Sequence, residues 1–362
     1  MKINKATVTY SSIVQIGENT QKLEIESGDK YLKLHRGVMD VTNIDVNSLN
    51  LNLDLNDLSL QQYSGNDGHP ELIKNIKSKF GLEDSHVVVT PGGMAALDLI
   101  INSLSEKTFY IPNLHWGSWN KILKTHEKEI KFFDDFNLDN FNETDGVVML
   151  CYPSNPTGYS PKLETIMKFL DWSKSQNLTV ILDLPYYYLF NDVSDGLSNY
   201  LHDNVILLSS FSKSVGLSGY RVGYISTKNT DLYNTLKIRS LYKYNSISTL
   251  PQIVISKLLE NDNIMNDYKS TTVENIKRNI DFLKENGLLF DEYTLTPVGP
   301  FAIVNMSHEE LLENKISSVP LNSFTLNKKS KYDNCSRVSV AVKHELFRDF
   351  FYRMLINEKT TI

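Results

Sequence analysis

The sequence predicts an α/β protein in which a mostly parallel central sheet, flanked by helices, forms a large domain beside a smaller α+β domain. Two observations lead to this prediction. From His86 to Thr227, short β-branched runs alternate with longer segments of helical periodicity, as parallel strands joined by crossover helices do. After about Pro251 this alternation gives way to long charged helices and a few short strands.

The predicted strands of the large domain are short apolar runs, and several lack polar alternation, as strands covered on both faces should. They are Val87–Val89, Phe109–Ile111, Ile130–Phe133, Val147–Leu150, Val180–Leu182 and Val205–Leu208. Between them, apolar residues recur at helical spacing in Ala96–Leu104 and in Ile166–Ser173. We therefore expect strands and helices to alternate through this region.

The remainder of the chain predicts the smaller domain. Helical patterns cover Asn263–Asn286 and Lys343–Asn357, and short strands are expected at residues 301–304 and 337–341. Residues 1 to about 40 contain short strand candidates that we expect to join this part. The predicted division is residues 41–245 for the large domain, and 1–40 with 246–362 for the small one.

Composition excludes several classes of protein. The 362 residues carry 37 Lys+Arg against 43 Asp+Glu, a formal charge of −6, which is too small and too evenly spread for a nucleic-acid-binding face or a polybasic membrane anchor. No run of about 18 apolar residues is present. Two cysteines, Cys151 and Cys335, cannot form a secreted disulfide framework, and the eight histidines are scattered singly, which favours core or surface roles over metal ligation. We expect a cytoplasmic protein whose partners are small molecules or other protein chains.

Two loops that follow predicted strands contain residues suited to binding a ligand. In Thr90-Pro91-Gly92-Gly93-Met94-Ala95-Ala96, paired glycines lead into a helix, where backbone N–H groups can hold a phosphate. In Cys151-Tyr152-Pro153-Ser154-Asn155-Pro156-Thr157-Gly158, two prolines bracket Asn155. Each segment alone is equally explained as a tight turn.

Charged residues end two further strands. Asp183 follows the apolar Ile181-Leu182, and a buried carboxylate in such a place needs a cation or strong donors. Lys213 lies in Ser209-Ser210-Phe211-Ser212-Lys213-Ser214-Val215-Gly216, with Arg221 eight residues further on. Hydroxyls, glycines and a second cation suit an anionic ligand, and a nearby positive charge lowers the pKa of a lysine toward useful nucleophilicity.

Together these four segments resemble those of the class I/II aminotransferase family, within the fold-type I pyridoxal-phosphate-dependent enzymes. The resemblance extends over roughly Leu34 to Met354, and the motifs come in the family's order. The Lys213 loop is similar to the family's Ser-x-Ser-Lys-x-x-Gly-x-x-Gly-x-Arg segment. Asn155 lies in its Asn-Pro-Thr-Gly turn, and Asp183 with Tyr186 match its Asp-x-x-Tyr pair.

The resemblance implies the cofactor pyridoxal 5′-phosphate and a role for each matching residue. Lys213 would form a Schiff base with the cofactor aldehyde and then act as general base and acid. Asp183 would pair with the protonated pyridine nitrogen, and Tyr186 and Asn155 would hydrogen-bond the phenolic oxygen.

The phosphate group would be held by Arg221 and by hydroxyls of Ser210 or Ser212, since a guanidinium suits a dianion. Backbone contacts to it would come from Gly92, Gly93 and Met94.

Other positions match the family less closely. Trp116, in Asn113-Leu114-His115-Trp116, falls where the family stacks an aromatic ring on the pyridine face. Tyr63 resembles the tyrosine that reaches a neighbouring subunit's phosphate, which implies a homodimer. Arg337 matches the arginine that grips the substrate α-carboxylate, and Asn155 and Gly37 would lie beside it.

The resemblance implies an aminotransferase that moves an amino group between an L-amino acid and a 2-oxo acid by a ping-pong route. Decarboxylases, lyases and cyclases use the same lysine and aspartate on this scaffold, so they stay as alternatives. A non-catalytic ligand-binding protein is a third interpretation, and the intact set of site residues argues against it. Where some acid-specific members have lysine after the paired glycines, this chain has Met94, which gives no support for a dicarboxylic substrate.

Overall fold

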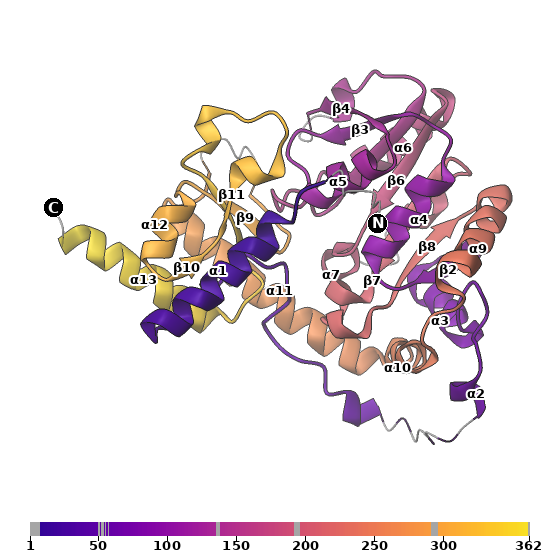
Figure 1. Ribbon diagram of the computed structural model, residues 1–362, viewed down its shortest axis with the longest axis horizontal. Coiled ribbons are helices and arrows are strands. Elements are labelled where there is room, and N and C mark those ends of the chain that lie inside the picture. Colours follow the sequence, from indigo (N-terminus) through magenta and orange to yellow (C-terminus); the bar gives the residue numbers. More distant parts are fainter. Residues whose placement is uncertain are drawn as a thin grey trace, which may run out of the picture.

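The computed structural model describes residues 8–49, 51, 54, 56, 58–134, 138–191, 196–290 and 296–360. Within this part of the chain the largest sheet has seven strands in the order β2-β8-β7-β6-β5-β3-β4 (Figure 1). The strands are β2 (His86–Thr90), β3 (Thr108–Pro112), β4 (Glu129–Phe133), β5 (Gly146–Cys151), β6 (Leu178–Asp183), β7 (Val205–Ser210) and β8 (Gly223–Thr227).

The prediction of a mostly parallel sheet is confirmed. The neighbours β4-β3-β5-β6-β7 all pair in parallel, and β8 runs antiparallel to both β7 and β2. Every residue of β5, β7 and β8 is buried, because helices cover both faces of the sheet, and this explains why these runs lack polar alternation.

Helices surround this sheet (Figure 1). They are α2 (Leu58–Gln61), α3 (Pro70–Phe80), α4 (Gly93–Ser103), α5 (Gly117–Thr125), α6 (Leu163–Ser175), α7 (Tyr187–Phe190), α8 (Phe211–Ser214), α9 (Thr230–Tyr244) and α10 (Thr249–Leu259). The short 3-10 helices are η1 (Val46–Leu49), η2 (Leu138–Asn140), η4 (Leu197–Tyr200), η5 (Ser218–Tyr220), η6 (Leu321–Phe324) and η7 (Ser330–Tyr332). Helices α4 and α6 confirm the two helical patterns expected between the strands, and α10 packs against α3.

The C-terminal part forms a second group of elements, to which the long helix α11 (Asp262–Glu285) leads (Figure 1). Strands β9 (Phe301–Val304), β11 (Val319–Pro320) and β12 (Ser336–Ser339) make an antiparallel sheet. Helices α12 (His308–Glu313) and α13 (His344–Thr360) flank them. The predicted helices and strands of this region are therefore present.

The N-terminal segment differs from its prediction. Instead of short strands it forms helix α1 (Ser12–Ser27) and then the two-residue strand β1 (Leu32–Lys33), which pairs in parallel with β10 (Ile316–Ser317). Ile13, Ile16 and Thr20 recur at helical spacing, and Gly28 ends the helix in the left-handed conformation. Residues 1–7 of the predicted small domain lie outside the described residues, and the boundaries at 40 and 245 stay a prediction.

Sheet register brings the predicted site residues together. Cys151 at the end of β5 pairs with Asp183 at the end of β6, and Asp183 pairs with Leu208 of β7, two residues before Ser210. Because parallel strands end at the same edge, the loops after β5, β6 and β7 meet there. In the described part of the chain no helix is both long enough and apolar enough to cross a membrane.

Candidate active site

A cavity of about 560 Å³ opens at this edge of the sheet. Its lining includes every residue predicted for the site except Gly92 and Tyr63. Elements from both ends of the chain contribute to it, because α1 and the loop after β1 close one side and β12 supplies Arg337. The cavity therefore brings together residues more than 300 positions apart in the sequence.

Lys213 lies in the one-turn helix α8, which starts where β7 ends. Ser210 caps this turn, since its hydroxyl accepts a hydrogen bond from the backbone N–H of Ser212 at 3.2 Å. The Lys213 amine donates to the carbonyl of Gly37. Burial, with the positive charges of Arg337 and Arg221, lowers the pKa of Lys213 to about 8. About a tenth of the amine is therefore neutral at pH 7, far more than for an ordinary lysine.

Asp183 is 6% exposed, and its Oδ2 accepts a hydrogen bond from the indole Nε1 of Trp119 at 3.0 Å. Burial raises the pKa of Asp183 to about 7, and the bond from Trp119 acts in the opposite direction. The carboxyl group is therefore held in one orientation in a place where its ionised form is costly.

Arg337 is 1% exposed and is fixed on several sides. Nη1 donates to Asn155 Oδ1 at 3.2 Å, Nη2 donates to the carbonyl of His35, and the guanidinium carbon lies 4.4 Å and 4.9 Å from the ring centroids of Phe301 and Phe324. Burial lowers the pKa of Arg337 to about 10, so it stays cationic at neutral pH. Its Nε is buried without a hydrogen-bond partner among the described residues, which leaves a donor available to a ligand.

Tyr186 and Asn155 lie beside this arginine. Burial, with nearby Cys151 and Asp183, raises the pKa of Tyr186 above its ordinary value. The phenol therefore stays protonated and can donate a hydrogen bond. Asn155 is 7% exposed; its Oδ1 accepts from Arg337, and a hydrogen bond between its side chain and Tyr186 acts to lower the pKa of that tyrosine.

The other end of the cavity is built around Arg221. Nη1 donates to Ser212 Oγ at 3.2 Å and to Ser218 O at 2.9 Å, and Nη2 donates to Pro91 O at 3.3 Å. Gly92, which has a φ of 87°, passes so close that a Cβ would lie 2.5 Å from Arg221 Nη2. Glycine is therefore required at the start of α4, where the guanidinium and the helix N-terminus come together.

Two residues that the sequence analysis did not assign take part in the site. Trp119, on α5, orients Asp183, and no motif in the sequence marks it. His35 accepts from Arg337 through its carbonyl, and its ring is fully buried. No sequence pattern marks this histidine, because its partners come from distant elements.

Tyr63 does not reach this cavity. It lies between α2 and α3 and is 81% exposed.

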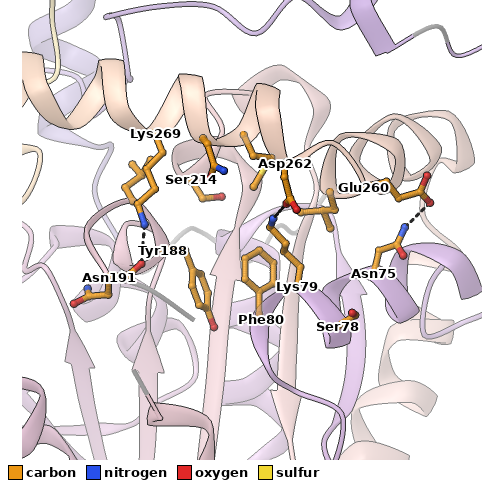
Figure 2. A pocket seen from close by; sticks show the side chains of 14 residues that line it. Asn75, Ser78, Lys79, Phe80, Tyr188, Asn191, Ser214, Glu260, Asp262 and Lys269 are labelled. Carbon is orange, nitrogen blue, oxygen red and sulfur yellow. Dashed lines mark hydrogen bonds and ion pairs between the residues drawn. The ribbon is translucent and has the colours of Figure 1, made fainter. Parts of the chain in front are cut away.

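A second cavity, of about 640 Å³, lies behind the Lys213 turn and is lined in part by Ser214 (Figure 2). Its charged side chains pair with neighbours: Lys79 with Asp262, and Glu260 with Asn75 at 2.9 Å. Figure 2 shows these groups turned toward one another. The cavity at the strand ends, which holds convergent cations and a buried carboxyl group, is therefore the candidate active site.

The family model for aminotransferases of class I and II matches residues 36–351. The chain belongs to this family. This aminotransferase is 26% identical over 302 residues to the histidinol-phosphate aminotransferase of Sulfurovum sp., covering 78% of this chain and 79% of that one. It is 27% identical over 315 residues to a probable aspartate aminotransferase of Methanocaldococcus jannaschii, covering 78% and 82%.

Solved structures share the fold of this aminotransferase. An aminotransferase from Mycobacterium tuberculosis superposes with a TM-score of 0.84 at 17% identity, covering 98% of both chains. The aspartate aminotransferase of Thermus thermophilus with maleate gives a TM-score of 0.81 at 19% identity, covering 98% of this chain and 100% of that one.

Proposed function

We propose that this aminotransferase holds pyridoxal 5′-phosphate in the cavity, attached covalently to Lys213. There it moves an amino group between an L-amino acid and a 2-oxo acid in two half-reactions. One observation carries the proposal: a buried carboxyl group, an amine of lowered pKa and two arginines line the same cavity at the ends of the parallel strands.

The residues present fit this cofactor. Burial raises the pKa of Asp183 to about 7, and a protonated ring nitrogen is the cation that would favour its ionised form. Gly92 leaves room for Arg221 beside the N-terminus of α4, a combination suited to a phosphate dianion. Ser210 and Ser212 place hydroxyl groups on the same side of the cavity.

When bound, pyridoxal phosphate supplies an aldehyde that takes up the amino group and a ring that withdraws electrons from the substrate α-carbon. Lys213 is the residue that moves the proton there, because its Nζ, with a pKa of about 8, can both accept and return it near neutral pH. The carbonyl of Gly37 holds Nζ in position.

Arg337 binds the substrate carboxylate in this proposal. Its Nε lacks a partner in the described part of the chain, and the two flanking rings fix the guanidinium plane before substrate arrives. Asn155 is oriented by the same arginine and lines the cavity beside Tyr186. Tyr186 stays protonated and would donate a hydrogen bond to the cofactor, and Trp116, which also lines the cavity, would supply the aromatic ring beside it.

The proposal includes a homodimer with Tyr63 contributed across the interface. Its 81% exposure, and its absence from the cavity of its own chain, support a role outside its own subunit. The domain division at residues 40 and 245 and the cytoplasmic location also stay predictions.

The test begins with the site of attachment. Purified protein is loaded with pyridoxal phosphate, reduced with borohydride, digested and mapped by mass spectrometry. We expect the adduct on Lys213 and no adduct in Lys213→Ala. Lys228, on the loop after β8, offers a matched control, because Lys228→Ala should keep the adduct.

The reaction type is then tested with panels of amino acids and 2-oxo acids. Transamination converts the cofactor to its amine form and is reversed by a 2-oxo acid. Release of carbon dioxide instead would overturn the proposed reaction and favour a decarboxylase. An adduct on a different lysine would overturn the site itself.

A further inference from the structure

The cavity lining includes apolar side chains from α1 and from the segment around Gly37, together with two residues that the proposed function places near the cofactor, Met94 and Trp116. These apolar side chains are named the apolar rim: Ile13, Val14, Val38, Met94 and Trp116. Val14 is 43% exposed, Val38 39% and Met94 44%, so three of the large hydrophobic side chains that the protein leaves exposed face one cavity. Such a convergence marks a binding surface.

Helix α1 is a fixed wall of this rim. Thr20 Oγ1 donates to Ile16 O at 2.8 Å and lies 2.8 Å from Ser317 Oγ, which in turn lies 2.8 Å from His35 Nδ1. Because the Thr20 proton goes to Ile16, the serine donates to Thr20 and accepts from His35 Nδ1–H. His35 Nε2 therefore carries a lone pair, and this atom has no hydrogen-bond partner in the described part of the protein.

The same face of α1 has no spare room. A Cβ at Gly17 would lie 3.0 Å from His35 Nε2, so the helix backbone rests directly on the imidazole. His35 also accepts from Arg337 through its carbonyl. One buried residue thus connects the wall of the rim to the arginine that binds carboxylate in the proposed function.

The geometry of an amino acid in this cavity directs its side chain to the rim. With the carboxylate on Arg337 and the amine at Lys213, the remaining large substituent of the α-carbon must point toward the rest of the lining. Gly37, whose carbonyl accepts from Lys213, is followed directly by Val38. The rim therefore begins next to the reacting amine.

The charged residues that α1 and the segment around Gly37 add to the cavity lining do not favour a substrate with a negatively charged side chain. Arg36 and Glu18 both line the cavity and have opposite signs, and the position after the paired glycines is occupied by Met94. We propose that the rim is the side-chain subsite and that it selects amino acids with uncharged, apolar side chains of the size of leucine, methionine or phenylalanine. This inference rests on the proposed function.

The test compares near-isosteric donors. Rates of the amino-donor half-reaction are measured for leucine against aspartate and for methionine against glutamate. We expect kcat/KM at least about tenfold higher for the apolar member of each pair, since an apolar pocket gives a side-chain carboxylate no partner to offset its loss of water. Calorimetric binding of α-methylleucine and α-methylaspartate, which lack the α-proton, gives a readout without turnover and should show the same order.

Two variants assign the selectivity to the rim. Val14→Lys should lower kcat/KM for leucine at least about tenfold and raise it for aspartate. Ile25→Lys, on the same helix at a residue that is 77% exposed and outside the cavity lining, should change neither. Thermal unfolding of both variants checks that α1 is retained.

The outcomes separate the two proposals. Faster reaction of aspartate and glutamate than of leucine and methionine overturns the apolar subsite while the aminotransferase proposal stands. Equal effects of Val14→Lys and Ile25→Lys overturn the assignment to the rim. If neither class of amino acid reacts and borohydride fixes no adduct on Lys213, the proposed function fails and the subsite with it.

Discussion

Replacing Asp183 by asparagine should stabilise the cofactor-free protein while it damages the enzyme. The carboxyl group is 6% exposed, and its described hydrogen-bond partner is Trp119, so its ionised form is poorly compensated without a ligand. Asparagine has nearly the same shape, and its Oδ1 can still accept from the indole. The substitution therefore removes the charge and keeps the packing.

The magnitude follows from the pKa of Asp183, which burial raises from 3.8 to about 7. Because the folded value is the higher one, the native state loses stability as pH rises from about 4 to 7, and the loss is complete above 7. At about 1.4 kcal/mol per pKa unit, this difference corresponds to an order of 4 kcal/mol at pH 8. Asp183→Asn should recover a large part of it.

The assay is thermal unfolding of cofactor-free wild type and variant at pH 5 and pH 8. We expect Asp183→Asn to raise the melting temperature clearly at pH 8 and much less at pH 5. The exposed Asp203→Asn serves as the control and should change neither. With cofactor and substrate present, Asp183→Asn should reduce kcat by roughly 10²-fold or more, since stabilisation of developing charge is lost.

A variant that is less stable than wild type at pH 8 without cofactor would refute the reasoning. So would a gain in stability that is the same at both pH values, because a buried charge must give a pH-dependent difference.

Three further predictions concern other parts of the site. Gly92→Ala should weaken pyridoxal phosphate binding at least about tenfold, since its Cβ would lie 2.5 Å from Arg221 Nη2. Gly28→Ala is the control, because a Cβ there meets no atom within 4 Å, and it should leave the cofactor Kd unchanged. A fluorescence titration measures both constants. Arg337→Lys should raise the substrate KM by roughly 10²-fold, because lysine has no counterpart of the Nε donor or of the planar guanidinium held by Asn155. Cofactor affinity should change little, and a matching loss of cofactor would contradict the role of Arg337. Thr20→Val should speed amide hydrogen exchange in α1 and raise the substrate KM, because it breaks the buried hydrogen-bond chain from Thr20 through Ser317 to His35. Thr20→Ser keeps the hydroxyl and should behave like wild type in both measurements. Equal behaviour of the two variants would show that this chain does not hold the helix.

Most of the large sheet could be predicted from the sequence because its inner strands are buried on both faces. Runs such as Val147–Leu150 must then be apolar throughout, and the helices between them show their own period. The N-terminal helix could not be predicted in the same way. Its fully buried residues are Gly17 and Thr20, neither of which signals a core helix, and Ile13 and Ile16 are only partly buried. What keeps α1 helical is its packing on the nearby His35 and on β10, which lies almost 300 residues further along the chain.

In the candidate site, too, some residues could be predicted from local sequence and others depend on distant contacts. Lys213, Asp183, Asn155 and Arg221 lie in short motifs, since each must follow directly on a strand end or a turn to reach the cavity. Trp119 belongs to no motif, because a hydrogen bond to Asp183 demands only that α5 lie beside β6.

The sequence by itself determined the order of strands and helices and the residues that end the strands, because these are local properties of periodicity and turn chemistry. Only the tertiary structure decided what surrounds those residues: the indole on Asp183, the two rings around Arg337, and α1 over the outer cavity. The reason is physical, since burial and the pKa shifts that follow from it depend on groups brought together across hundreds of residues, and no local pattern records which groups those are.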